Sequence, residues 1–156
     1  MKWKNIVVTG CSKGIGKAAA KTLLEEGYQV ACISRSEPGI DHPSFLHVRA
    51  DISQEEEVSR AFQLIKEKRE TPVDVLVNNA AIGYRGPLDE MSSEDWHKLF
   101  NLNVHGLFYT TREVIPDMKA MERGQIINIS SGAGSNGIAQ MVAYCGSKHA
   151  VKGISH

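Results

Sequence analysis

Tyr144 and Lys148, which are four residues apart, are the side chains in this sequence best suited to proton transfer. On a helix, a separation of four places both side chains on one face. The unperturbed pKa of a phenol is about 10, which is too high for acid–base work at neutral pH. A nearby ammonium group favours the phenolate and lowers that pKa toward a useful range. The pair predicts a general acid or base, although the same spacing also arises by chance.

Ser131 lies thirteen residues before Tyr144, just past an apolar segment that we expect to be a strand. The carboxyl ends of parallel strands are where doubly wound sheets bind their ligands. The Ser131 hydroxyl is therefore placed to hold a carbonyl or alkoxide oxygen beside Tyr144. Ser130 is the rival for this role, and either serine can equally be an ordinary loop residue.

Asn103 falls on the apolar stripe of a predicted long helix, which carries Trp96, Leu99, Leu107 and Val114. An amide in that position needs internal hydrogen-bond partners, because an unpaired buried polar group is costly. Two interpretations stay open: a structural asparagine, and one that binds water or relays a proton.

A glycine-rich turn near the start of the chain predicts a nucleotide site. Gly10, Gly14 and Gly16 have the spacing G-x-x-x-G-x-G, which differs from the usual dinucleotide fingerprint, G-x-G-x-x-G. The physical consequences are shared, because glycines permit a tight turn and let backbone amides approach a pyrophosphate. The helix that follows adds free N–H donors and a partial positive charge. The position of the turn, between a strand and a helix, favours ligand binding over a turn without a ligand.

The end of the second predicted strand distinguishes NADP from NAD. A carboxylate there would bind the ribose 2′-hydroxyl of NAD, but the sequence reads Ser34-Arg35-Ser36. Arg35 can bind a 2′-phosphate, and Lys13 can add a second positive charge. We expect NADP, with NAD as the alternative because Glu37 is close by. Both basic residues can also be solvated surface side chains.

The segments that must position these residues alternate between strand-like and helix-like apolar periods, the pattern of an α/β domain. Gly27 is expected to end the first helix, and Ser53 with Glu56 to form a capping box that opens the second. Several strands are apolar throughout, which predicts a doubly wound parallel sheet with helices on both faces. We expect strands over residues 5–9, 28–33, 45–48, 73–77 and 125–129, and helices over 14–26, from 53, from 92 or 93, and from about 142.

The composition is that of one ordinary globular domain: 156 residues, 42% hydrophobic, with 18 basic and 18 acidic side chains. Zero net charge gives no electrostatic footprint for nucleic acid or an anionic membrane, and no apolar run has membrane-spanning length. The three scattered cysteines, Cys11, Cys32 and Cys145, predict reduced thiols and a cytoplasmic protein. Cys145 and His149 favour a buried thiol beside a surface imidazole over a metal site, so we expect no metal.

Together these segments resemble the short-chain dehydrogenase/reductase family, in its compact single-domain branch. The family's Thr-Gly-x-x-x-Gly-x-Gly turn is similar to residues 9–16, and its adenine-side aspartate to Asp51. Its Asn-Asn-Ala-Gly segment is similar to residues 78–81, where Ala81 replaces the last glycine. The family's catalytic tetrad matches, in order and spacing, Asn103, Ser131, Tyr144 and Lys148.

The resemblance implies hydride transfer between a nicotinamide and a small-molecule carbonyl or secondary alcohol. It makes Tyr144 the general acid or base and Lys148 the residue that binds the nicotinamide ribose and lowers the tyrosine pKa. Ser131 would orient the substrate oxygen, and Asn103 would hold a water in the proton relay. It further implies a homo-oligomer, a dimer or tetramer, formed through the long and the final helices. The implied coenzyme residues are Gly10, Ser12, Lys13, Gly14, Ile15, Gly16, Arg35, Asp51, Ile52, Asn79, Ala80, Tyr144 and Lys148.

The sequence stops at His156, in a segment that reads as a continuing helix, whereas members of the family run on to further strands and a substrate loop. We expect a single domain over residues 1–156 with a Rossmann-like sheet incomplete at its C-terminal edge, where the fifth strand is exposed. A non-catalytic nucleotide-binding fragment is the alternative function. A dehydratase or epimerase of the extended branch is the third, disfavoured by the glycine spacing. The substrate itself is not predicted.

Overall fold

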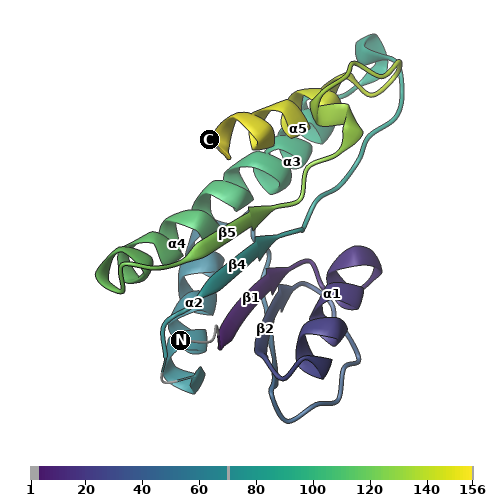
Figure 1. Ribbon diagram of the computed structural model, residues 1–156. Coiled ribbons are helices and arrows are strands. Elements are labelled where there is room, and N and C mark those ends of the chain that lie inside the picture. Colours follow the sequence, from purple (N-terminus) through teal and green to yellow (C-terminus); the bar gives the residue numbers. More distant parts are fainter. Residues whose placement is uncertain (1–3, 70, 156) are drawn as a thin grey trace.

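The computed structural model describes residues 4–69 and 71–155 and shows strands and helices in alternation around one sheet (Figure 1). The sheet has the strand order β3-β2-β1-β4-β5, and every neighbouring pair is parallel. The predicted parallel sheet is confirmed, with β5 at one edge. Its strands are β1 (Asn5–Thr9), β2 (Gln29–Ser34), β3 (Phe45–Arg49), β4 (Val75–Asn78) and β5 (Gln125–Asn128).

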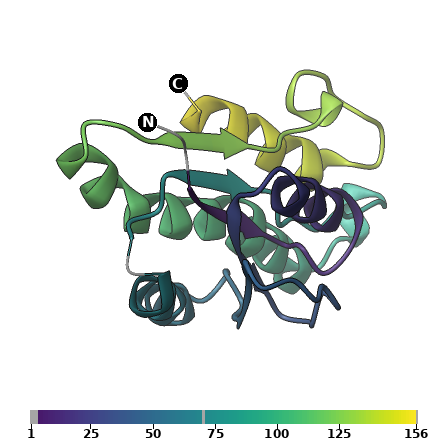
Figure 2. The ribbon, with the colours of Figure 1, turned by 60° about the horizontal axis from the view of Figure 1, so that its bottom comes forward.

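Helices cover both faces of the sheet, as Figure 2 shows. One face packs against α1, through a core that includes Ile6 and Val8, and the other against α2 and α4, through a core that includes Val7 and Ile33. Such strands are buried on both faces, which explains their unbroken apolar runs. The helices are α1 (Gly14–Glu25), α2 (Glu55–Arg69), α3 (Ser93–Phe100), α4 (Gly106–Ala120) and α5 (Val142–Ile154), with short turns η1 (Leu88–Glu90), η2 (Asn101–His105, π-helical) and η3 (Gly132–Gly134).

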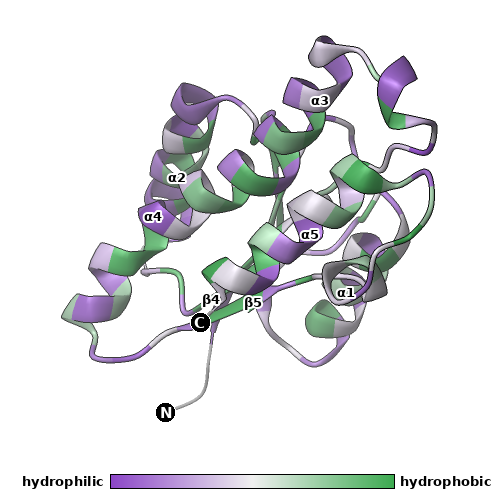
Figure 3. Ribbon diagram, turned by 90° about the horizontal axis from the view of Figure 1, so that it is seen from above, coloured by the Kyte–Doolittle hydropathy of each residue, from purple (hydrophilic) through white to green (hydrophobic). Residues whose placement is uncertain are grey.

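The last helix, α5, lies beside α3 and the π-helical turn η2, so it runs along the helical layer that contains α4 (Figure 3). It ends at Ile154, where the Ser155 hydroxyl donates to Val151 O. The sequence was expected to stop inside or just after this helix, and the helix ends two residues before His156, which lies outside the described residues. Within residues 4–69 and 71–155, no helix combines the length and apolar character needed to cross a lipid bilayer.

The predicted helix boundaries hold at two ends and fail at a third. Ser92 caps α3 by accepting a hydrogen bond from Asp95 N at 3.0 Å, and Gly27 ends α1 with a φ of 82°. The capping box at Ser53 does not form, because α2 begins only at Glu55. The Ser53 hydroxyl and backbone N–H both donate to the Asp51 carboxylate, so Ser53 belongs to the turn before the helix.

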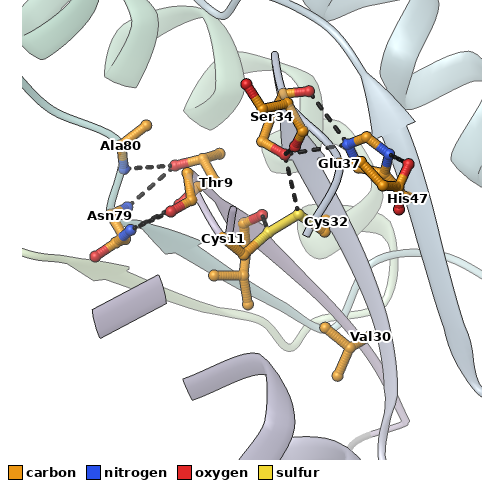
Figure 4. Close-up of a disulfide and its surroundings, with 12 residues drawn as sticks. Thr9, Cys11, Val30, Cys32, Ser34, Glu37, His47, Asn79 and Ala80 are labelled. Carbon is orange, nitrogen blue, oxygen red and sulfur yellow. Dashed lines mark hydrogen bonds and ion pairs between the residues drawn. A yellow bond between two sulfur atoms is a disulfide. The ribbon is translucent and has the colours of Figure 1, made fainter. Parts of the chain in front are cut away.

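Two of the three cysteines are not reduced thiols, contrary to the prediction. A disulfide joins Cys11 to Cys32, and both residues are fully buried (Figure 4). The parallel register of β1 with β2 pairs Val8 with Cys32, which brings the two cysteine Cα atoms to 6.0 Å. Cys145 is the predicted buried free thiol. The His149 ring bonds the Cys145 carbonyl, and no group of three candidate metal ligands occurs among the described residues.

Candidate active site

A cleft of about 410 Å³ opens at the carboxyl ends of β1, β2 and β4. It receives the glycine turn after β1, the end of β2, and the segments that follow β3 and β4. Most of the predicted coenzyme residues lie together here, namely Gly10, Ser12, Lys13, Ile15, Arg35, Asp51, Ile52, Asn79 and Ala80. Gly14, Gly16, Tyr144 and Lys148 are not among the residues that line this cleft.

The glycine turn is held against the end of β4. The Asn79 amide donates to Thr9 O at 3.0 Å and to Gly10 O at 3.1 Å. The Thr9 hydroxyl in turn accepts from the backbone N–H groups of Asn79 and Ala80, each at 3.1 Å. A Cβ on Gly16 would lie 2.5 Å from Gly10 O, so only glycine lets α1 approach the strands this closely.

The first turn of α1 faces the cleft and is suited to an anion. Gly14 has a φ of 58° with open space around the position of a Cβ. The N-cap residue is Lys13, and no side chain of the described chain caps this helix end. Its first N–H groups therefore stay available for a phosphate, which the helix dipole also favours. Ile15 beside them is 68% exposed, an apolar side chain at the rim of the cleft.

Charged side chains also line the cleft. The Arg35 guanidinium lies 3.6 Å from the Asp51 carboxylate. Both residues line the cleft, as does Lys13. Glu37 does not line the cleft, and its carboxylate lies 2.8 Å from His47 Nδ1.

Tyr144 and Lys148 lie close together on α5, as their spacing predicts. Lys148 is only 4% exposed, and its ammonium lies 5.9 Å from the centre of the Tyr144 ring. The ammonium donates to Ile129 O at 2.7 Å, which ties α5 to the end of β5. Burial lowers the pKa of Lys148. A second, small cavity beneath the cleft is lined by Lys148 together with Thr9, Ile52, Asn78 and Asn103.

The two candidate serines differ in how their hydroxyls are used. Ser130 donates to Lys148 O at 3.3 Å, so its proton is engaged in holding the loop to α5. The Ser131 hydroxyl accepts from Ala133 N at 3.2 Å, and no bond between described residues uses its proton. Ser131 is therefore the better placed of the two to donate to a substrate oxygen.

Asn103 sits in η2 and is 2% exposed. Its carbonyl oxygen accepts from Ile82 N at 2.9 Å, and its amide donates to Ile82 O at 2.8 Å and to Ser147 Oγ at 3.0 Å. The side chain thus links a residue that lines the cleft to α5. These bonds give the amide a structural role, while the water relay implied by the resemblance stays a prediction.

Some residues that line the cleft were not predicted from the sequence. Ser34 and Ser36 flank Arg35 and line the cleft with Ala50 and Leu102. Ser34 is the last residue of β2, and Ser36 and Ala50 lie just past the ends of β2 and β3, a position that was a usable signal. His47, which lies on β3 opposite Cys32, gave no such signal, because its partners depend on the strand register.

Comparison with known proteins places the chain in a family. The family profile described as short chain dehydrogenase matches residues 4–156. An NADPH-dependent pterin aldehyde reductase from Arabidopsis thaliana is 34% identical over 161 residues, covering 97% of this chain and 66% of that protein. The curated relatives that head the comparison are longer, and the chain spans between 53% and 66% of the first four.

Solved structures agree in fold. A short-chain dehydrogenase from Streptomyces avermitilis superposes with a TM-score of 0.93 at 29% identity, over 99% of this chain and 58% of that one. A gluconate 5-dehydrogenase from Burkholderia cenocepacia, in complex with NADP and tartrate, superposes with a TM-score of 0.87 at 30% identity, over 99% and 64%. With the family profile covering nearly the whole sequence, the chain belongs to the short-chain dehydrogenase/reductase family of oxidoreductases.

Proposed function

We propose that this chain forms the coenzyme-binding and catalytic part of an NADP-dependent oxidoreductase acting on a carbonyl or a secondary alcohol. The observation that carries the proposal is the cleft, which is lined by a glycine turn at an uncapped helix N-terminus and by the basic side chains of Arg35 and Lys13. Two of the proteins similar to this chain are named for NADPH or solved with NADP. The volume of the cleft, about 410 Å³, lies within the range of small-molecule sites.

The residues present suit a dinucleotide carrying a 2′-phosphate. The free N–H groups at the start of α1 would hold the pyrophosphate, and Gly14 leaves room for its approach. Arg35 and Lys13 would hold the 2′-phosphate, and the 3.6 Å contact with Asp51 keeps the Arg35 guanidinium at the cleft. Exposed Ile15 would be covered by the bound nucleotide.

When bound, the coenzyme would supply or accept the hydride, and the chain's own residues would handle the proton. Tyr144 would give its phenolic proton to the substrate oxygen during reduction, or take it during oxidation. The buried Lys148 ammonium, 5.9 Å from the Tyr144 ring, would stabilise the phenolate form. The free proton of Ser131 would hold the same substrate oxygen in place.

The second candidate function is a nucleotide-binding module without catalysis. The observation that favours it is that Tyr144 and Lys148 do not line the coenzyme cleft. The two functions differ in turnover and agree in coenzyme binding.

Fluorescence titration with NADPH and, separately, NADH tests the coenzyme assignment. We expect saturable binding of both, with NADPH the tighter ligand. Arg35→Ala should weaken NADPH about tenfold, the equivalent of one charge-assisted contact of about 1.4 kcal/mol, and leave NADH almost unchanged. Binding of neither coenzyme would refute the proposed function.

Tyr144→Phe tests the catalytic assignment. The variant should bind NADPH like the unaltered protein and lose about 10²- to 10⁴-fold in turnover on a panel of carbonyl substrates. Tyr109→Phe is the matched control, because Tyr109 lies on α4 among Phe108, His105 and Arg112. Full activity of Tyr144→Phe would contradict the assignment. Coenzyme binding without any turnover by the unaltered chain would instead favour the non-catalytic module.

A further inference from the structure

Glu37 is an acidic side chain beside the coenzyme cleft that is held out of it. Ser34, Arg35 and Ser36, the three residues before it, all line the cleft, and Glu37 does not. Its side chain is 72% exposed, yet the carboxylate lies 2.8 Å from His47 Nδ1. Figure 4 shows the His47 ring standing between Ser34 and Glu37.

His47 is itself fixed in place. It lies on β3 and pairs with Cys32 on β2, and its side chain is only 13% exposed. Its Nε2 lies 3.1 Å from Ser34 Oγ and 3.3 Å from Ser34 O. Ser34 Oγ also lies 2.8 Å from Ser36 O, so the hydroxyl joins the ring to the turn after β2.

The His47 ring therefore bridges two groups: the Glu37 carboxylate lies on one nitrogen, and the two Ser34 oxygens lie on the other. Because a carboxylate only accepts hydrogen bonds, the Nδ1–H of His47 donates to Glu37. This contact holds the Glu37 carboxylate against a side chain of β3.

We propose that His47 is a positioning residue that sets the coenzyme preference of this site by sequestering Glu37. The inference rests on the proposed function, since it requires a nicotinamide coenzyme in the cleft. A carboxylate at the end of β2 accepts hydrogen bonds from the ribose hydroxyls of NAD and repels the 2′-phosphate of NADP. With Glu37 bound to His47, the charged residues that line the cleft are Arg35, Lys13 and Asp51, and the Asp51 carboxylate is already paired with Arg35.

The test compares the ratio of the NADH and NADPH dissociation constants in four proteins: unaltered, His47→Ala, Glu37→Gln, and the double variant. His47→Ala frees Glu37 and should reduce the preference for NADPH about tenfold, by tightening NADH and weakening NADPH. Glu37→Gln alone should change the ratio less than twofold, because Glu37 is already held away. In the double variant the original preference should return, since no carboxylate is left to release.

Two further variants keep the test decisive. His47→Gln preserves most of the side chain's bulk but cannot bridge Ser34 and Glu37, so it should shift the ratio in the same direction as His47→Ala. His42→Ala is the matched control, because His42 accepts from Ser44 N in the loop before β3 and makes no bond to Glu37. That variant should leave the ratio unchanged.

The outcomes separate this inference from the proposed function. If the unaltered protein binds neither coenzyme, or prefers NADH, both fail. If it prefers NADPH and neither His47 variant changes the ratio, only the inference is overturned. A loss of affinity that is equal for both coenzymes, or that Glu37→Gln does not reverse, assigns His47 a purely structural role and also overturns it.

Discussion

Replacing Gly16 with alanine should damage both the stability of the fold and the binding of the coenzyme. The added Cβ would lie 2.5 Å from Gly10 O and closer still to Asn79 Nδ2. Real Cβ atoms do not approach so closely, so one of these groups must move. Neither moves freely, because the Asn79 amide donates to Thr9 O and to that same Gly10 O.

The cost can be worked from these contacts. Displacing the Asn79 amide breaks two hydrogen bonds of about 1 kcal/mol each. Overpacking adds roughly 1 kcal/mol at the low end of its range. Alanine returns about 1 kcal/mol, because it is the better helix former inside α1. The free energy of unfolding should therefore fall by about 2 kcal/mol, and the displaced turn should weaken NADPH binding at least tenfold, or about 1.4 kcal/mol.

Urea denaturation and NADPH titration measure the two effects, with Gly153→Ala as the matched control. Gly153 also lies within a helix, α5, but a Cβ there meets no atom within 4 Å. The same substitution should thus stabilise the protein by about 0.5–1 kcal/mol and leave coenzyme affinity unchanged. The reasoning is refuted if Gly16→Ala is as stable as the control, or if it binds NADPH like the unaltered protein.

Two further predictions concern the sheet. Reducing the Cys11–Cys32 disulfide, which spans 21 residues, should lower the free energy of unfolding by about 3 kcal/mol in urea titrations. Without reductant, the denatured protein should show one titratable thiol, and a count of three would contradict the disulfide. Burial alone would raise the pKa of Asp74, but hydrogen bonds from Asn5 N and Lys4 N and the ion pair with Arg123 lower it overall. Since the folded pKa is below the unfolded one, this stabilisation is present above the unfolded pKa of about 3.9 and is lost as pH falls through the folded value. Asp74→Asn should lower the free energy of unfolding by about 2 kcal/mol at neutral pH, and it should reduce the loss of stability on acidification. If the variant lost stability with falling pH as steeply as the unaltered protein, this assignment to Asp74 would be wrong.

Most of the strands and helices could be predicted from short sequence patterns, because each depends on residues that are close together in the sequence. The apolar run of β1 and the glycine turn after it need only neighbouring residues to be recognised. Ser92 caps α3 through a bond to Asp95, three residues away. The same reasoning failed at Ser53, because Ser53 is held in a turn with Asp51, two residues earlier, and α2 begins only at Glu55.

Features that depend on strand register escaped prediction. Nothing in a separation of 21 residues links Cys11 to Cys32 until β1 pairs with β2. The same holds for His47, which meets Glu37 only because β3 lies next to β2. For this reason the sequence left NAD open on account of Glu37, whereas the structure supplies a reason for that carboxylate to stay out of the cleft.

The two ends of the sheet differ in role: contacts at the amino ends of the strands stabilise the fold, and the carboxyl ends form the cleft. Substitutions can therefore affect stability and coenzyme binding separately. Asp74 joins Asn5 and Arg123 at the amino ends of the strands, whereas the cleft lies at their carboxyl ends. A change at Asp74 should therefore lower stability and leave the NADPH dissociation constant unchanged wherever the protein stays folded. Gly16 is different, because its contact with Asn79 joins the first helix to the cleft, so there the two effects should appear together. If changes at Asp74 and at Gly16 weakened NADPH binding equally, the measured affinity would reflect only the fraction of protein that is folded. The contact between Gly16 and Asn79 would then have no separate effect on the cleft.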